Sequence, residues 1–178
     1  SSSNWFDNQT GFSFRKFLDE DKSAYDPAHG SEIWYVRIRY AEILLIASEA
    51  ALELGNDDKA LEYINDVRER AGLNGLESMT LLDIEQERRV EFALENQRWW
   101  DLKRWRLAHL DVSKGGLTNF RGTALCPYYN VKSGKYTFET GVPEKRKRLF
   151  LEKNYYTVFR AEDLSTNPLM TQNPGYGN

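Results

Sequence analysis

The sequence is poor in the residues that cross-link a chain or bind metals. Of its 178 residues, one is a cysteine, Cys126, and two are histidines, His29 and His109. A disulfide within the chain and a zinc site built from cysteines are therefore both excluded. The two histidines lie far apart in the sequence without ligand-type neighbours, so we expect no metal site. A glycine-rich phosphate loop is also missing, and we expect no cofactor.

Long apolar runs and an excess of one charge are missing as well. The apolar stretch at residues 43–47 is flanked by Glu42, Ser48 and Glu49, and it is far shorter than the roughly 20 residues that span a bilayer as a helix. The formal net charge is −3, which gives no indication of nucleic-acid binding. Residues 1–5 lack the basic start and apolar core of a signal peptide, which taken alone predicts a cytoplasmic protein.

The sequence does contain clear helical periodicity. Residues 36–54 predict a long helix with apolar residues on two flanks, so we expect neighbours on more than one side. Gly55 suits the left-handed residue that ends a helix, and Asn56 or Asp57 can cap a second helix. That helix is expected to end before Gly72, and its predicted inward row is Ala60, Ile64, Val67 and Ala71.

The helix–glycine–helix unit at residues 36–72 resembles a tetratricopeptide (TPR) repeat. One such unit cannot bury both of its faces, so it needs helical neighbours. A third helix is predicted over residues 80–109, where Thr80 and Asp83 have the spacing of a capping box. We expect this helix to continue to about residue 95, to bend near Asn96 and then to resume.

The rest of the chain is rich in residues typical of loops. Short strands are expected at residues 11–17 and 136–138. We therefore predict a mainly α protein with a single domain over residues 1–178, in which a TPR-like helical pair and a long third helix are joined to loop-rich N- and C-terminal segments. The C-terminal loop-rich part is expected to cover residues 110–178.

The most informative segment is the charged and aromatic stretch at residues 85–105. Glu85 to Arg89 are five consecutive polar residues, which cover more than one helical turn, so at least one charge must face the packing surface. Partners are expected on the same helix, because residues three or four apart are neighbours there. The predicted pairs are Glu85 with Arg89, Arg88 with Glu91, Glu95 with Arg98, and Asp101 with Arg104. Trp99, Trp100 and Trp105 follow at helical spacing, which predicts packing between helices.

This stretch closely resembles the signature of the SusD/RagB family. In that signature, Glu-Arg-Arg and a later glutamate are followed by Arg-Trp, an aromatic residue, Asp-Leu, a basic residue and a second Arg-Trp. The C-terminus is also similar, because the aromatic pair at Tyr155 and Tyr156 is followed by Asn167-Pro168 and by a Gln-Asn-Pro-Gly-aromatic ending from Gln172. At residues 158–160 the sequence reads Val-Phe-Arg, which departs from the proline-containing segment that the family commonly has there. The resemblance covers nearly the whole chain but only the C-terminal part of the family's length.

The resemblance implies a SusD-like α/α fold and a function without catalysis. Members are nutrient-binding lipoproteins of the outer membrane in Bacteroidetes. It therefore implies binding of an oligosaccharide or similar nutrient at the cell surface and delivery to a SusC-like TonB-dependent transporter. It also implies that the signal peptide and the lipid-anchored cysteine of the full-length protein lie upstream of this region.

Two other functions are compatible with parts of the sequence. A glycoside hydrolase needs two carboxylates that face each other across a sugar. Glu87, Glu91 and Glu95 instead stack on one helix face beside arginines, which favours an ion-pair ladder, so we expect no catalytic residue. A TPR-type adaptor that binds a peptide in a helical groove is the other alternative, although the Asn-Pro and Gln-Asn-Pro-Gly ending has no role in it. The basic run at residues 144–148 is balanced by nearby acids, which favours a solvated loop over a polyanion contact.

Candidate ligand-binding residues come from the loops. Sugars present apolar C–H faces that stack on tryptophan and tyrosine rings, and their hydroxyl groups need polar partners. No motif assigns a binding role to a particular residue. The aromatic residues in or next to polar loop sequence, and hence the weak candidates for stacking, are Trp5, Tyr25, Trp34 and Tyr35.

Overall fold

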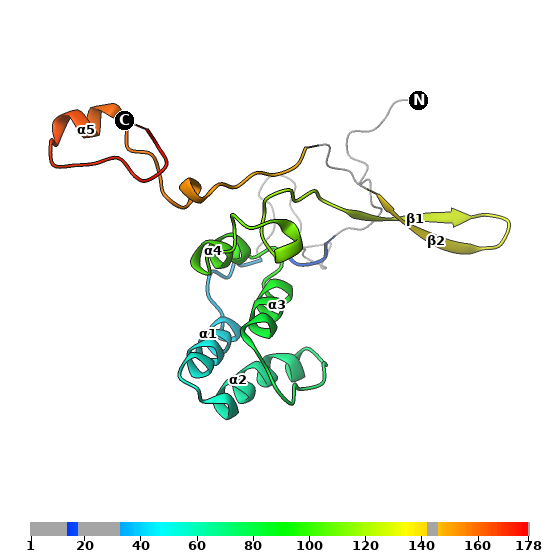
Figure 1. Cartoon of the computed structure of the whole chain (residues 1–178). Helices are drawn as coiled ribbons and strands as arrows, with labels where there is room; N and C mark the ends of the chain where they lie inside the picture. Colours follow the sequence, from blue (N-terminus) through cyan, green and yellow to red (C-terminus); the bar gives the residue numbers. More distant parts are fainter. Residues whose placement is uncertain (1–13, 18–32, 142–145, 178) are drawn as a thin grey trace. The chain divides into compact units, whose positions relative to one another are not determined.

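The computed structural model describes residues 14–17, 33–141 and 146–177 and is mainly helical, as predicted (Figure 1). Two compact units are present, one from Arg15 to Trp100 and one that includes the residues from Asp101 onward. We call them the helical unit and the C-terminal unit. The single domain expected from the sequence stays a prediction. Every helix in the described part of the chain is too short or too polar to cross a membrane.

The helical unit contains the predicted helical pair, α1 (Tyr40–Glu53) and α2 (Asp57–Arg70). Helix α1 starts later than the expected residue 36, because Arg39 has an extended backbone and is its N-cap. Asn56 caps α2 by accepting a hydrogen bond from the amide of Lys59 at 3.3 Å. The TPR-like hairpin predicted from the sequence is therefore formed.

Both helices end in the manner that their glycines predict. Gly55 and Gly72 have positive φ angles of 71° and 78°. The amide after each glycine bonds back to the last turn, from Asn56 to the carbonyl of Ala51 and from Leu73 to that of Arg68. These bonds are the Schellman arrangement, in which a left-handed residue lets the chain cap its own carbonyls.

The core of the helical unit lies where α1, α2 and α3 (Leu81–Glu91) meet. Ala60, Ile64 and Val67 of the predicted inward row are buried, whereas Ala71 is exposed because it is already the C-cap of α2. The hydroxyl of Ser48 is also buried and donates to the carbonyl of Ala60 at 2.7 Å, which joins α1 to α2. The small residues on α1 thus permit close approach of the two helices.

The predicted third helix is interrupted earlier and more widely than expected. Thr80 does begin α3, and its amide donates to the carboxylate of Asp83 at 2.7 Å. Helix α3 stops at Glu91, and α4 covers only Gln97–Arg104 rather than continuing to residue 109. The cause is three left-handed residues, which break the helical hydrogen bonds. They are Leu94, Asn96 and Arg106, with φ angles of 69°, 62° and 59°.

The C-terminal unit contains a small core and a β-hairpin. The core is formed by Leu102, Ala108 and Phe150. Strands β1 (Ala124–Asn130) and β2 (Lys135–Gly141) pair antiparallel, so the strand expected at residues 136–138 is confirmed and is longer than predicted. Residues 14–17, part of the other expected strand, form a turn, and residues 11–13 lie outside the described residues.

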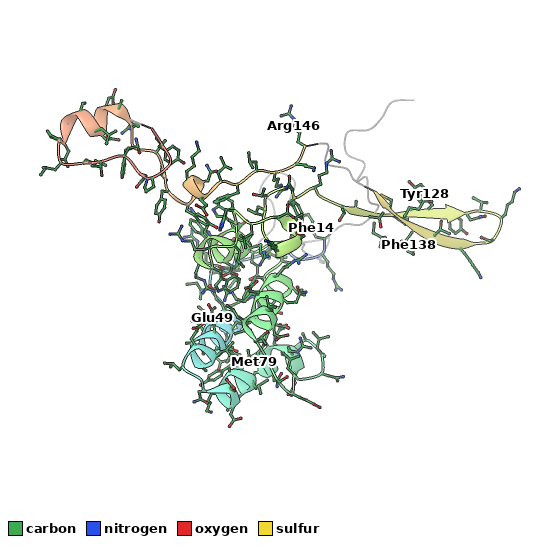
Figure 2. The ribbon with its side chains drawn as sticks, in the orientation of Figure 1. Phe14, Glu49, Met79, Tyr128, Phe138 and Arg146 are labelled. Atoms are coloured by element: carbon green, nitrogen blue, oxygen red, sulfur yellow. The ribbon has the colours of Figure 1, made fainter. Side chains whose placement is uncertain are left out.

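One face of the hairpin is aromatic and exposed. The register places Leu125, Pro127 and Tyr129 opposite Thr140, Phe138 and Tyr136 on a single face, since side chains alternate along a strand. The rings of Tyr129 and Tyr136 lie 4.9 Å apart. Tyr128 and Phe138, both labelled in Figure 2, belong to opposite faces of this hairpin.

The C-terminal tail is held by its own amide side chains. After the short helices η1 (Val112–Lys114), η2 (Glu152–Tyr155) and α5 (Ala161–Thr166), the chain turns back on itself (Figure 1). The side chain of Gln172 accepts from the amide of Phe159 at 3.0 Å and donates to its carbonyl at 2.9 Å. Asn173 donates to the carbonyl of Thr157 at 2.6 Å. The Gln-Asn pair of the C-terminal motif therefore acts as a structural clip.

Candidate functional site

Only two of the four aromatic candidates predicted from the sequence can be placed. Trp34 is 87% exposed, and Tyr35 is about half exposed. Tyr35 packs its ring against Phe17 at 5.7 Å, and its hydroxyl accepts a hydrogen bond from Asn96 at 3.2 Å. Trp5 and Tyr25 lie outside the described residues. A ligand-binding role for any of the four stays a prediction.

The glutamates of α3 and of the turn after it are held in ion pairs. The guanidinium of Arg39 contacts both oxygens of Glu95, at 2.9 and 3.0 Å, and also Glu91 at 2.5 Å. Arg70 at the end of α2 also pairs with Glu91 at 2.5 Å. Lys16 pairs with Glu95 and donates to the carbonyl of Glu91 at 3.1 Å. We call this arrangement the carboxylate cluster.

The electrostatic environment of the carboxylate cluster indicates a structural role rather than a catalytic one. Burial alone would raise the pKa of Glu95, but the hydrogen bonds from Arg39 and Lys16 outweigh it and hold that pKa below its ordinary value. A general acid at neutral pH needs the opposite shift. Glu87 is likewise buried and pairs with Arg68 at 2.7 Å. The sequence predicted partners on the same helix, whereas these partners come from other elements.

The tryptophans differ from the prediction that they are core residues. Trp99 is 45% exposed and Trp100 is 63% exposed, because on the short helix α4 the buried positions are Asp101 and Leu102. Trp105 is partly buried, with the guanidinium of Arg104 4.5 Å from the centre of its ring. The predicted pair of Asp101 with Arg104 is present at 3.4 Å.

The exposed tryptophans border a pocket of about 510 Å³ in the helical unit. It is lined in part by the segment between α3 and α4, where Leu94 and Asn96 are left-handed. Two tryptophans, two arginines and one asparagine are among its lining residues. We call it the tryptophan pocket, and its lining residues are Arg89, Phe92, Ala93, Leu94, Asn96, Arg98, Trp99 and Trp100.

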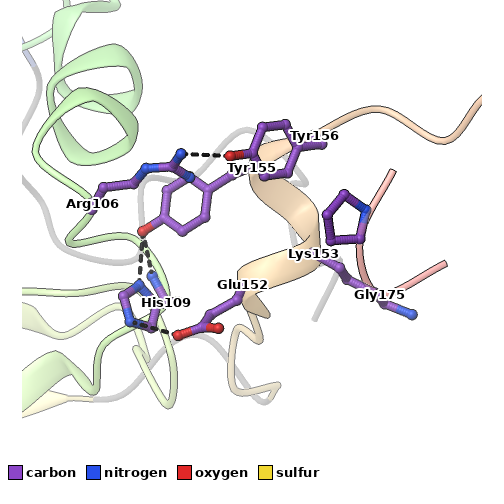
Figure 3. A pocket seen from close by; sticks show the side chains of 8 residues that line it. Arg106, His109, Glu152, Lys153, Tyr155, Tyr156 and Gly175 are labelled. Carbon is purple, nitrogen blue, oxygen red and sulfur yellow. Dashed lines mark hydrogen bonds and ion pairs between the residues drawn. The ribbon is translucent and has the colours of Figure 1, made fainter. Parts of the chain in front are cut away.

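A second pocket, also of about 510 Å³, lies in the C-terminal unit (Figure 3). We call it the tyrosine pocket. The hydroxyl of Tyr155 lies 2.9 Å from Nδ1 of His109, whose other ring nitrogen lies 3.5 Å from Glu152. Arg106 donates to the hydroxyl of Tyr156 at 2.7 Å and stacks on the ring of Tyr155 at 4.5 Å. The side chains of His109 and Arg106 in this pocket are therefore already paired with the other polar groups named above.

The two pockets differ in what they offer a ligand. In the tyrosine pocket, a ligand must replace existing bonds of Arg106 and His109, which reduces the net gain from binding. The tryptophan pocket offers more exposed aromatic surface, because Trp99 and Trp100 are 45% and 63% exposed, while the amide of Asn96 in its lining already donates to the hydroxyl of Tyr35. Aromatic faces next to planar hydrogen-bonding groups match the C–H faces and hydroxyl groups of a sugar ring. The tryptophan pocket is therefore the better candidate site.

Sequence reasoning missed both pockets for identifiable reasons. Helical spacing assigned Trp99 and Trp100 to the core, since nothing in the sequence indicated that α4 would be so short. His109 was judged only as a possible metal ligand. In the described residues, no group of three or more His, Cys, Asp or Glu side chains is arranged to hold a metal ion.

The fold and its pockets agree with the family that the sequence matches. The described residues form a mainly helical scaffold whose low-exposure glutamates are paired with arginines and whose surface carries two pockets lined in part by aromatic residues. The model of the SusD family matches residues 1–176. The chain belongs to the SusD family.

Individual relatives agree with this assignment. A SusD-like protein from Bacteroides ovatus is 32% identical over 159 residues, which cover 77% of this chain and 28% of the relative. SusD-like protein P2 from Formosa agariphila is 39% identical over 97 residues, which cover 47% of this chain and 19% of the relative. This chain thus spans less than a third of the length of either relative.

Solved structures show the same fold. A SusD-like protein from Bacteroides fragilis superposes with a TM-score of 0.61 at 29% identity, covering 80% of this chain and 26% of that one. Surface glycan-binding protein A from Bacteroides uniformis superposes with a TM-score of 0.55 at 28% identity, covering 85% of this chain and 30% of that one. The mainly α, SusD-like fold expected from the sequence is therefore confirmed.

Proposed function

We propose that this chain takes part in the non-catalytic capture of a glycan or similar nutrient at the surface of the bacterial outer membrane. The observation on which the proposal depends is the SusD family match over residues 1–176. The similarity to a structure named as a surface glycan-binding protein supports it. The proposal includes a lipid anchor on the full-length protein and delivery of the ligand to a SusC-like TonB-dependent transporter.

The geometry supports binding rather than hydrolysis. The glutamates considered for catalysis, Glu87, Glu91 and Glu95, are bound by arginine side chains at 2.5–3.0 Å. A hydrolase would need one of a facing pair to remain protonated at neutral pH. The tryptophan pocket is the proposed site, with the indole of Trp100 as the most exposed aromatic surface among its lining residues.

Binding can be tested by affinity electrophoresis of the whole 178-residue chain in gels that contain soluble polysaccharides. We expect at least one polysaccharide to retard the chain, without release of reducing sugar ends on prolonged incubation. Trp100→Ala should reduce the retardation, whereas Tyr156→Ala, which removes an exposed aromatic ring from the tyrosine pocket, should not. Release of reducing ends would contradict the proposal, and a loss confined to Tyr156→Ala would move the site to the tyrosine pocket.

Delivery can be tested in cells with the full-length protein. Deletion of its gene should prevent growth on the glycan that the chain binds, while growth on the constituent monosaccharide continues. Equal growth of the deletion strain on both carbon sources would contradict a role in uptake.

A further inference from the structure

We propose that one face of the β1–β2 hairpin is the surface on which the N-terminal part of the full-length protein docks, the part that the family resemblance places before this chain. We call it the aromatic face. None of its six side chains is charged, and they belong to Leu125, Pro127, Tyr129, Tyr136, Phe138 and Thr140. The inference is independent of the proposed function, because it concerns how the full-length protein packs and not what it binds.

The aromatic face is open to solvent in the described part of the chain. Tyr129 and Tyr136 are 54% and 62% exposed, although their rings pack against each other at 4.9 Å. Every residue from 128 to 140 is exposed. Among the helices and strands of the described residues, β1 and β2 contact chiefly each other. Exposed aromatic surface that is gathered in one patch marks an interaction site.

The opposite face of the same hairpin is suited to water. It carries Tyr128, but its other side chains include those of Asn130, Lys135 and Glu139. An antiparallel sheet commonly places one face against a core and the other face in water, and this produces an alternation of apolar and polar residues along each strand. The alternation in β1 and β2 therefore predicts that only the aromatic face is covered.

The cover is expected to be permanent and to belong to the same polypeptide. A two-stranded hairpin alone is marginally stable in water and needs to pack against another element. A glycan or a transporter that binds and dissociates would leave the hairpin without this packing for part of the time. A face without charged side chains is also more typical of an obligate interface than of a transient one. Relatives in the family are long enough to supply the cover, because this chain spans less than a third of their length.

Hydroxyl-radical footprinting of the full-length protein, without added glycan or transporter, tests the proposal. Tyr128 is the internal control, since it is 54% exposed like Tyr129 but lies on the opposite face. With rates normalised to those of the unfolded protein, Tyr129 and Tyr136 should be oxidised about tenfold more slowly than Tyr128, because a covered ring reacts only when its cover opens. In the 178-residue chain, the three tyrosines should be oxidised at similar rates.

Two lysine variants of the full-length protein provide a second measurement. Tyr136→Lys places a charge on the covered face, where it loses its water, and should lower the midpoint of thermal unfolding by several degrees. Tyr128→Lys is the matched control on the polar face and should leave the midpoint nearly unchanged. In the 178-residue chain, where the cover is missing, the two variants should unfold at similar temperatures.

The outcomes identify what covers the face. Equal oxidation of the three tyrosines in the full-length protein overturns the proposal. Protection that appears only after a glycan or the transporter is added also overturns it, because the cover is then that partner. Protection of Tyr129 and Tyr136 already in the 178-residue chain overturns it as well, because the cover then lies within this chain. A failure of glycan binding in the electrophoresis test contradicts the proposed function and leaves this inference unaffected.

Discussion

Arg39 and Glu95 are 56 residues apart in the sequence and form a two-pronged ion pair, with Nε and Nη2 of the arginine at 2.9 and 3.0 Å from the two carboxylate oxygens. The pair joins the segment before α1 to the turn after α3. The side chain of Glu95 is only 8% exposed, so its charge depends on this partner and on Lys16. The relationship makes the stability of the helical unit sensitive to acid.

We expect Glu95 to contribute stability at neutral pH and to lose it in acid. Its pKa in the folded chain lies below the ordinary value of 4.5, so the contribution is complete above pH 4.5 and disappears as the pH falls through the folded pKa. Glu95→Gln should cost about 2 kcal/mol at neutral pH, and the difference from the native chain should shrink below pH 4.5. Thermal unfolding followed by circular dichroism across this range measures both effects.

The exposed pair of Lys59 and Glu62, at 2.7 Å, provides the control for this experiment. Exposed pairs contribute little because water solvates both charges. Glu62→Gln should therefore change stability by less than about 0.5 kcal/mol at any of these pH values. Equal losses for the Glu62 and Glu95 variants would show that the position of Glu95 in the carboxylate cluster has no special energetic role.

The partners of Glu95 also show where sequence reasoning reaches its limit. Spacing along a helix identified that charge pairing was required, and it placed Arg98 three residues away as the partner. It could not identify Arg39 or Lys16, because long-range pairing depends on how the helices pack. Helix caps and helix ends were predictable because they depend only on residues close by in the sequence. The glycine at position 55 and the capping residues Asn56 and Thr80 act on their own neighbours.

Burial of Ile64 is expected to be a main source of stability in the helical unit. This side chain is fully buried on α2, whereas Ile43 on α1 is 51% exposed. Ile64→Ala should lower the free energy of unfolding by about 3 kcal/mol, because it removes buried apolar surface and leaves a cavity. Ile43→Ala is the matched control, with an expected change within about 0.5 kcal/mol.

Denaturation by urea, followed through the helical signal, measures both isoleucine variants. A loss for Ile43→Ala as large as that for Ile64→Ala would mean that the outer face of α1 is covered in solution. The periodicity of the sequence predicted apolar surface on two flanks of α1, but it could not show which flank the described residues cover.

The candidate site was less predictable than the fold. A bend near Asn96 was predicted, but the left-handed conformations of Leu94 and Asn96, which separate α3 from α4 beside the pocket at Trp99 and Trp100, were not. The packing of Trp99 and Trp100 between helices was expected from a third helix that resumes to residue 109, whereas α4 ends at Arg104. The C-terminal motif, by contrast, was recognised correctly, although its physical role as a clip on Phe159 appears only in the structure.

Asp111 is expected to remain ionised to unusually low pH. Hydrogen bonds from the side chain of Asn119 at 2.7 Å and from the amide and hydroxyl of Ser113 at 2.9 and 2.8 Å lower its pKa from 3.8 to about 2. The contribution of Asp111 to the loop is therefore complete above pH 3.8 and is lost as the pH falls through about 2. A titration followed by carboxyl-carbon NMR measures this pKa directly.

Asn119→Gly tests the cause of the shift. Asn119 has a φ of 63°, so glycine keeps the backbone conformation while removing the amide that donates to Asp111. The pKa of Asp111 should rise toward its ordinary value. Ser113→Ala, which removes the hydroxyl donor but retains the amide donor, should produce a smaller rise. An unchanged pKa in the Asn119 variant would show that this hydrogen bond is not formed in solution.

Gly175 should be irreplaceable for the attachment of the tail to η2. Its φ is +83°, and a Cβ built there would lie 2.7 Å from Cβ of Lys153. Gly175→Ala therefore combines a left-handed alanine, which costs about 1–2 kcal/mol, with a clash that the backbone must move to relieve.

The amide of Phe159, which donates to Gln172, should exchange its hydrogen about tenfold faster, since each 1.4 kcal/mol is a factor of ten. Gly177→Ala is the control, because a Cβ at Gly177 meets nothing within 4 Å. If both variants exchange at the native rate, the Gln-Asn clip holds the tail without any contribution from the glycine, and the close approach at Lys153 has no energetic consequence.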